Sequence, residues 1–194
     1  MGETADDLVM KSPREVAERV LALIVVVRTV HNPDGTMSWM RTHSLERYLS
    51  ANEARFVAQD DPSHESQVEF SWRAEAVVSL LWALSGLAEM PKMDQEFSVF
   101  ESEMIGEAIE NPETFLSTAK LRPAEELNEM EQFLYHQHWR VRDYQLFPKR
   151  QRDPLSDGEQ PIEELNPEIV YERRYGMSWL VGWGRDWDNV PTDT

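Results

Sequence analysis

The sequence predicts an all-α fold, a compact multi-helix bundle around one buried central helix. Three observations predict it. Apolar residues recur at helical spacing over most of the 194 residues. Helix-start signals precede several of these stretches, and the stretch 72–87 is apolar on nearly all sides. A helix that is apolar all round is buried all round, so the other helices are expected to pack against this one.

The first half of the chain begins with a clear helix start. Residues 12–15, Ser-Pro-Arg-Glu, form a capping box with proline at the first helical position. Helical spacing of apolar residues then runs from Val16 to Val27, and Asn-Pro-Asp-Gly at 32–35 is typical of a turn that ends the helix. The helices expected next lie at 44–51, at 53–58 and, for the central helix, at 66–88.

The second half predicts further helices and one polar loop. The helices expected there lie at 101–110, at 112–121, at 123–146 and from 167 onward. The stretch Phe-Ser-Val-Phe at 97–100 suggests a short strand. Residues 148–166, which are polar and carry prolines, are expected to form a surface loop, and residues 1–11 a flexible tail. We therefore expect one globular helical domain over residues 1–194.

The net charge of the chain is strongly negative. Lys and Arg number 19 against 36 Asp and Glu, a formal charge of −17. This balance argues against nucleic acid and against anionic membrane surfaces as partners, because both require basic side chains. Between residues 86 and 131, twelve acidic residues stand against three basic ones. Such a surface would attract a basic protein partner; the alternative is that the charge only keeps the protein soluble.

Several chemistries have no motif in this sequence. The chain contains no cysteine, which excludes disulfides and thiol catalysis. It has no His-Glu-x-x-His motif, no glycine-rich phosphate loop and no Gly-x-Ser-x-Gly elbow, so neither a metal nor a cofactor is expected. The acidic N-terminal residues lack the pattern of a signal peptide, and the expected location is the cytoplasm.

Three short segments combine charged residues with aromatic ones. They are Trp72-Arg73-Ala74-Glu75, His138-Trp139-Arg140-Val141-Arg142-Asp143, and Tyr171-Glu172-Arg173-Arg174-Tyr175 followed by Trp179. A guanidinium beside an apolar face needs a carboxylate, and a buried carboxylate needs a cation. We expect the segments to meet as one buried network of Arg73, Glu75, His138, Arg142, Asp143, Glu172 and Arg173. Its aromatic wall would consist of Trp72, Trp139, Tyr175 and Trp179.

The pairing within this network is open at the level of sequence. The possible partners of Arg73 are Glu69, Asp143, Glu172 and an aspartate of the C-terminal tail, residues 186–194. The possible partners of Glu75 are Arg142, Arg173 and Arg174. In one interpretation the network is a scaffold that fixes helix register and holds the C-terminal segment on the bundle.

The other interpretation of the network is a functional pocket. Arg73 and Arg142 would hold an anion there, while Glu75, His138 or Asp143 handles protons. These last three are the candidate catalytic residues. His138 lies on the apolar stripe of its helix, a position that also suits a hydrogen-bonded core residue.

The same segments carry a family resemblance. Trp-Arg-Ala-Glu at 72–75 with Leu-Leu-Trp-Ala-Leu at 80–84, and the segments 138–143, 171–180 and 186–194, follow one another in order. Together they resemble a mainly bacterial family named domain of unknown function 4272, over roughly residues 66–194. The resemblance implies membership of that family and no particular activity.

Two classes of function follow. The favoured one is a non-catalytic acidic binding protein that engages a basic protein partner, as an inhibitor or an immunity-type protein does. The alternative is an enzyme or a small-anion-binding protein that uses the buried Arg, Glu, His and Asp cluster. No oligomeric state follows from the sequence.

Overall fold

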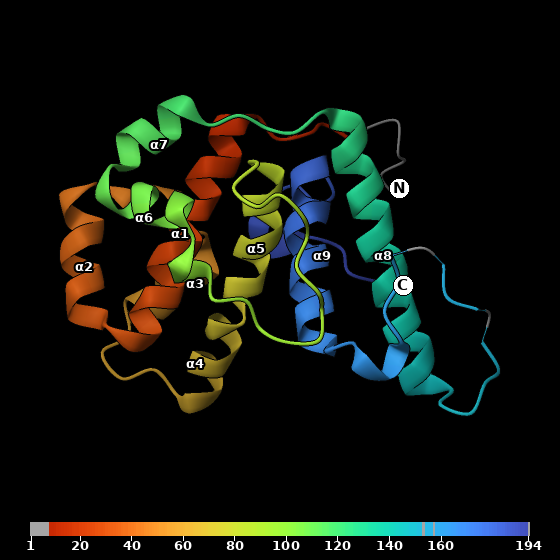
Figure 1. Ribbon diagram of the computed structural model, residues 1–194. Helices are drawn as coiled ribbons and strands as arrows, with labels where there is room; N and C mark the ends of the chain where they lie inside the picture. The colour runs from red at the N-terminus through yellow and green to blue at the C-terminus, as the bar shows by residue number, and fades with distance from the viewer. Residues whose placement is uncertain (1–7, 153, 157, 194) are drawn as a thin grey trace.

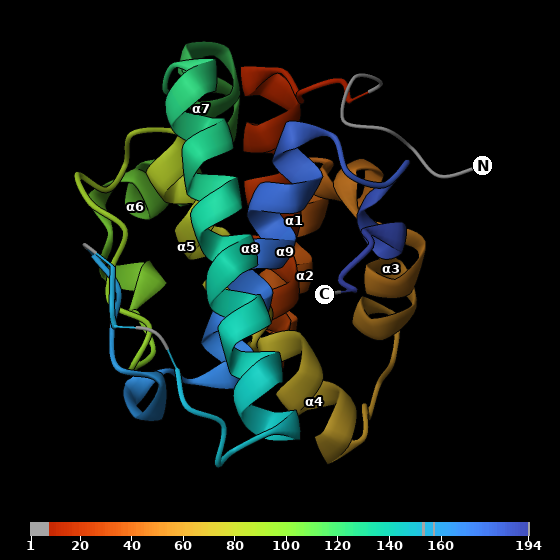
Figure 2. The same ribbon diagram turned by 90° about the vertical axis from the view of Figure 1, so that its right-hand side faces the viewer.

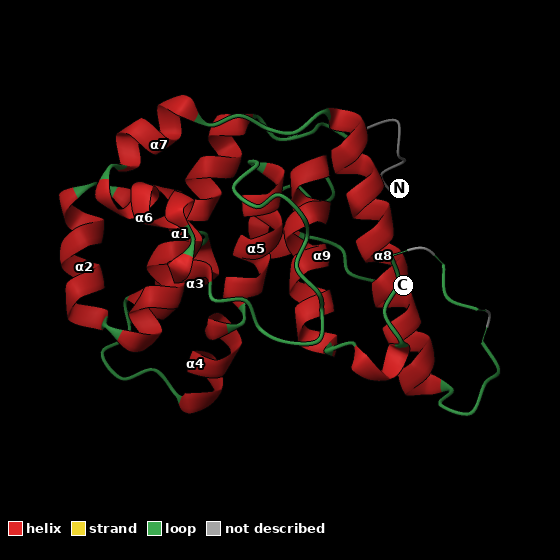
Figure 3. Ribbon diagram, in the orientation of Figure 1, coloured by secondary structure: helices red, strands yellow, loops and turns green. Residues whose placement is uncertain are grey.

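The structure is all-helical, as the sequence predicts. The computed structural model describes residues 8–152, 154–156 and 158–193, and none of these lies in a β-strand (Figures 1 and 3). Their α-helices are α1 (Pro13–His31), α2 (Pro33–Thr42), α3 (Ala51–Val57), α4 (His64–Ser71), α5 (Arg73–Ala83), α6 (Glu103–Glu110), α7 (Pro112–Thr118), α8 (Ala124–Leu146) and α9 (Pro167–Val181). Short 3₁₀ helices are η2 (Leu45–Tyr48), η3 (Val99–Glu101), η4 (Ile162–Glu164) and η5 (Trp187–Asn189).

Four helices form the body of the molecule. α5 packs between α1 and α9, and α9 packs between α5 and α8 (Figure 1). α2 and α7 contact α1, and α6 contacts α7 beside them. The view turned by 90° shows α8 in front of α9 (Figure 2). This arrangement places α5 and α9 at the centre.

The burial of individual residues follows from that arrangement. Every residue from Glu75 to Ala83 in α5 is buried, which confirms the predicted central helix. α9 is almost as enclosed, since Tyr171 is the only partly exposed residue between Ile169 and Val181. Residues 20–27 of α1 are exposed by no more than 3%. These three helices supply much of the apolar core.

The central helix is shorter than the predicted range 66–88. Trp72 lies between the last residue of α4 and the first residue of α5. α5 ends at Ala83 because Ser85 adopts a left-handed backbone conformation (φ 65°), and Gly86 donates its N–H to the carbonyl oxygen of Leu81 at 2.8 Å. This is a Schellman motif, which satisfies carbonyl groups at the end of a helix.

α2 is missing from the sequence prediction. The turn cluster at 32–35 ends α1, but it also begins α2. The side chain of Asn32 accepts a hydrogen bond from the N–H of Gly35 at 3.1 Å, and Pro33 occupies the first helical position. The cluster is therefore a junction between two helices and not a loop.

One further prediction needs correction, and another lies mostly outside the described residues. The strand suggested at 97–100 is wrong: Val99 begins η3, and the N–H of Phe97 donates to the carboxylate of Glu75 at 2.9 Å. The predicted flexible tail covers residues 1–11, of which 1–7 lie outside the described residues. The rest of it packs on the end of α9, where Lys11 donates its N–H to Leu180 at 2.8 Å and the backbone of Val9 lies against Gly182.

Candidate functional site

Three consecutive charged residues of α9 are buried, and each has a different partner. They are Glu172, Arg173 and Arg174, with exposed fractions of 5%, 0% and 4%. Successive residues of a helix point about 100° apart, so neighbours in sequence face different neighbours in space. α9 is enclosed by α5, by α8, by the loop that follows α5 and by the C-terminal segment. All three side chains therefore point into the protein.

Glu172 pairs with Arg73 at the start of α5. The Nη1 of Arg73 lies 3.1 Å from Oε2 of Glu172, and the guanidinium lies 5.0 Å from the centre of the Tyr175 ring. Burial, opposed in part by the charge of Arg73, raises the pKa of Glu172 to about 7. The pair ties the first turn of α5 to α9.

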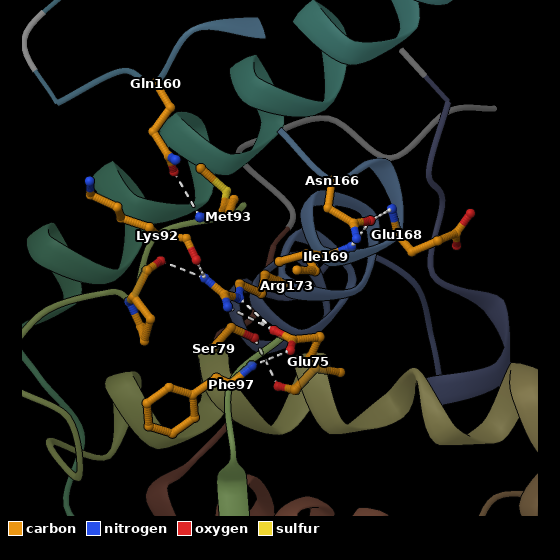
Figure 4. A network of polar contacts seen from close by, with 12 residues as sticks. Glu75, Ser79, Lys92, Met93, Phe97, Gln160, Asn166, Glu168, Ile169 and Arg173 are labelled. Atoms are coloured by element: carbon orange, nitrogen blue, oxygen red, sulfur yellow. Dashed lines mark hydrogen bonds and ion pairs between the residues drawn. The ribbon is translucent and has the colours of Figure 1, made fainter. Parts of the chain in front are cut away.

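Arg173 pairs with Glu75, and together they hold the loop that follows α5. The Nε of Arg173 donates to Oε2 of Glu75 at 2.8 Å, and its Nη1 donates to the carbonyl oxygens of Pro91 and Lys92 (Figure 4). The other carboxylate oxygen of Glu75 accepts the N–H of Phe97. This network therefore joins two central helices and both ends of the 91–97 stretch.

Arg174 binds His138 of α8 and the C-terminal segment. Its Nη1 lies 2.5 Å from Nδ1 of His138 and donates to the carbonyl oxygen of Thr192, and its Nη2 donates to the carbonyl oxygen of Asp193. Since a guanidinium carries only donors, Nδ1 must accept, and the proton of the neutral ring sits on Nε2. Burial, together with the charges of Arg174 and Arg142, lowers the pKa of His138 to about 4.

Two predicted members lie outside this network. Arg142 is exposed and donates to the side chain of Gln145 at 2.9 Å. Asp143 is buried, but its partners are Arg150 and Arg152 of the loop after α8. The sequence instead suggested Asp143 as a partner of Arg73 and Arg142 as a partner of Glu75, and neither pair forms.

The predicted aromatic wall is divided. Tyr175 and Trp179 are buried, and each meets the ring of Trp187 edge-on, with ring centres 5.1 and 5.5 Å apart. Trp72 is partly buried near Glu75. Trp139 is no part of the wall: it is 45% exposed and stacks on His136. Trp187, which the prediction omitted, is the ring that links Tyr175 and Trp179.

A third buried ion pair was not predicted. Arg19 of α1 donates to Glu53 of α3 at 2.8 Å, with exposed fractions of 5% and 1%. The guanidinium lies 4.9 Å from the ring centre of Trp187. The sequence contains one indication that Arg19 is buried, because this residue directly precedes the longest apolar stretch of α1.

The arrangement separates the residues proposed for chemistry. Arg73, Glu75, His138 and Asp143 each contact a different partner, namely Glu172, Arg173, Arg174 and Arg150. The Nδ1 of His138 is occupied by a donor, and Glu75 has both oxygens bonded. These contacts give each side chain a role in holding helices and loops together.

The acidic segment, residues 86–131, lies on the surface. It comprises the loop after α5, η3, α6, α7 and the start of α8 (Figures 1 and 2). Eleven of its twelve acidic side chains are exposed, and Glu131 is partly buried. Among the described residues, ion pairs are formed only by Glu113 with Arg47 and by Glu126 with Arg122.

A groove of about 600 Å³ opens within the acidic segment, between the end of α5, α6 and α7. Leu84, Met104 and Phe115 give it apolar walls, and Glu107 lines it from α6. Lys120 lines it as well. The groove therefore has apolar walls with one acidic and one basic side chain, within a segment whose exposed side chains are mostly acidic.

The described residues form neither a metal site nor a membrane span. No group of three or more His, Asp or Glu side chains is placed to hold a metal ion. No helix there combines the length and the apolar character that crossing a bilayer requires.

One of three comparisons with known proteins finds a match, and it covers the motifs at 72–84, 138–143 and 171–180. No curated protein and no solved structure matches the chain significantly. One family model matches residues 2–190, which is nearly the whole chain and extends well before the segments that carry the resemblance. The chain therefore belongs to the family described as domain of unknown function DUF4272.

Proposed function

We propose that this protein is a non-catalytic binding protein whose acidic segment engages a basic protein partner, as an inhibitor or an immunity-type protein does. The observation that carries the proposal is the exposure of eleven of the twelve acidic side chains in residues 86–131. Charges of one sign on one surface repel each other and attract a partner of the opposite sign, which speeds association.

The groove supplies what charge alone does not. Exposed charges steer a partner and set the association rate, whereas apolar anchors in a pocket supply most of the affinity. The walls formed by Leu84, Met104 and Phe115 offer such an anchor site within the acidic surface. A basic partner with an apolar side chain amid its lysines or arginines would fit both features.

Arg122 illustrates how this surface binds a guanidinium. Its Nε donates to the carbonyl oxygen of Trp82 at 2.8 Å, and its Nη2 donates to that of Leu87 at 2.8 Å. Both carbonyls belong to the end of α5 or the loop behind it, where the helix dipole is negative. The same electrostatics favour an arginine or lysine brought by a partner.

The alternative, an enzyme or a small-anion-binding protein, has less support. Its candidate residues would need a shared open cavity. Arg73, Glu75, His138 and Asp143 instead occupy four separate contacts. We therefore favour the binding protein.

The test compares three forms of the protein as bait for basic proteins of a cell extract. Glu103→Lys, Glu107→Lys and Glu110→Lys together reverse one face of α6, where all three side chains are exposed. We expect the wild type to retain a basic protein that salt releases, and the reversed form to lose at least about tenfold in affinity for it.

The matched control reverses three exposed acids elsewhere, by Glu46→Lys, Asp60→Lys and Glu65→Lys. This control changes the net charge by the same amount but leaves the acidic segment unchanged, so it should keep the partner. Equal loss in both variants would mean that only overall charge matters, and retention by both would contradict the proposal.

A further inference from the structure

A second hollow lies away from α6 and α7, between α8 and the end of α9. Its volume is about 690 Å³, a size typical of small-molecule sites. Asn128, Glu131, Gln132 and Tyr135 line it from one face of α8, since residues three and four apart lie together on a helix.

The other walls come from distant parts of the chain. Leu8 and Met10 line the cavity from the segment before α1, which is held on α9 by the hydrogen bond from Lys11 to Leu180. The remaining apolar lining is formed by Val181, Trp183 and Pro191. The cavity thus has an apolar lining and an indole ring.

The lining of this cavity has more acidic than basic side chains. Glu131 and Asp193 bring two carboxylates, and Arg174 brings one guanidinium. The two terminal nitrogens of Arg174 are bonded within the protein, to His138 and to the carbonyl oxygens of Thr192 and Asp193. One negative charge of the lining is therefore left without compensation.

Glu131 is the acidic group best placed to meet a ligand. One of its oxygens accepts the hydroxyl of Ser178 at 3.0 Å, and no described basic side chain forms an ion pair with it. Burial raises the pKa of Glu131, while Ser178 and Arg174 lower it. A cation placed in the cavity would replace the solvation that this carboxylate has lost.

We propose that this cavity binds a small organic monocation, an amine with an apolar body. The ammonium group would pair with Glu131 and the Trp183 ring, because the faces of aromatic rings attract cations. The apolar body would contact the side chains of Leu8, Met10 and Val181. An anion fits less well, since the Nε of Arg174, its nitrogen without a partner in the structure, is closed to solvent.

This site is separate from the acidic groove and does not rest on the proposed partner. The test uses linear primary alkylamines from propylamine to heptylamine, which are cationic at neutral pH. Binding to the full chain is measured by ligand-observed NMR titration at physiological ionic strength. Affinity should rise about fourfold for each added methylene, because each one buries more apolar surface in the cavity.

Two variants locate the binding. Glu131→Gln keeps an acceptor for Ser178 but removes the charge, and should weaken heptylamine binding about tenfold or more. Glu129→Gln, at an exposed position two residues away, removes the same charge and should have no effect. Gln132→Trp introduces a bulky ring from an exposed lining position and should block the cavity without disturbing the core.

The proposal fails if affinity does not depend on chain length, since diffuse attraction to an acidic surface gives that result. It also fails if Glu131→Gln and Glu129→Gln bind alike, or if heptanoate binds as well as heptylamine. Should Glu131→Gln not fold, undiminished binding by Gln132→Trp would still overturn the proposal.

Discussion

At the scale of the residue, the buried charges of α9 are explained by pairing. Taking a charge out of water costs several kcal/mol, roughly, unless an opposite charge and hydrogen bonds compensate for it. Glu172 and Arg173 each find an opposite charge on α5, and Arg174 is compensated by hydrogen bonds to His138 and two carbonyl oxygens. The large effect of a mutation here comes from leaving the other partner buried alone.

Arg173→Met should show this effect most clearly. It leaves Glu75 buried without a cation and removes the donor to Pro91 and Lys92, so the free energy of unfolding should fall by about 3–5 kcal/mol. Denaturant titration measures the loss. The double variant Glu75→Leu with Arg173→Met should recover part of it, because no unpaired charge remains; a loss equal to the sum of the two single losses would contradict this account.

His138 predicts a specific loss of stability in acid. Its folded-state pKa of about 4 lies below its ordinary value of 6.5, so the neutral ring stabilises the fold above pH 6.5, and this contribution is lost as the pH falls through about 4. The size is on the order of 3 kcal/mol. Unfolding of His138→Gln, which keeps an acceptor for Arg174, should depend less on pH over that range.

The control for this measurement is His64→Gln, at an exposed position. It should follow the pH profile of the wild type. If His138→Gln and the wild type lose the same free energy between pH 7 and 4, the ring does not titrate as described.

At the scale of the element, the fold depends on how closely α9 approaches α5. Gly176 makes this approach possible, because a Cβ there would collide with the hydroxyl of Ser79 and lie 3.0 Å from the carbonyl oxygen of Ala76. Both contacts belong to a fully buried part of α5, which has little room to move. The glycine is thus needed for packing, since its backbone conformation is that of an ordinary helix.

Gly176→Ala should therefore destabilise the protein by about 1–3 kcal/mol through overpacking. Gly106→Ala is the matched control, because it is also helical and a Cβ there meets no atom within 4 Å. That variant should be stabilising by up to about 1 kcal/mol, as alanine favours helix. Thermal unfolding of both variants distinguishes the two effects. If both variants were more stable than the wild type, α5 and α9 would be able to move apart, and the packing account of Gly176 would be wrong.

At the scale of the whole molecule, charges inside and outside follow different rules. Apart from Arg174, the buried charged residues of the described chain form ion pairs, for example Arg19 with Glu53 and Arg173 with Glu75. The exposed ones of residues 86–131 are nearly all acidic and mostly without an ion pair to described residues. The inner pairs join α1, α3, α5 and α9, while the outer charges are available to a partner.

Much of the fold could be predicted because its signals are local. The capping box at Ser12 and the proline-marked starts of α7 and α9 depend on a few neighbouring residues, and α8 differs from its predicted range by one residue. α2 was missed although the same Asn-Pro signal begins α7 and α9, because at Asn32 it followed a helix and was taken as its end. The end of α5 depends on Ser85, whose left-handed conformation no sequence rule favours.

The sequence by itself determined that Arg73, Glu75, Glu172 and Arg173 need partners, because unpaired charges cannot be buried among apolar residues. Only the tertiary structure decided which charges meet, since Arg73 and Glu172 are 99 residues apart and several candidates were chemically equivalent. It also decided that Trp139 faces solvent and that Trp187 lies inside. Helix spacing fixes which residues share a face, but which face turns inward depends on the packing of the whole chain.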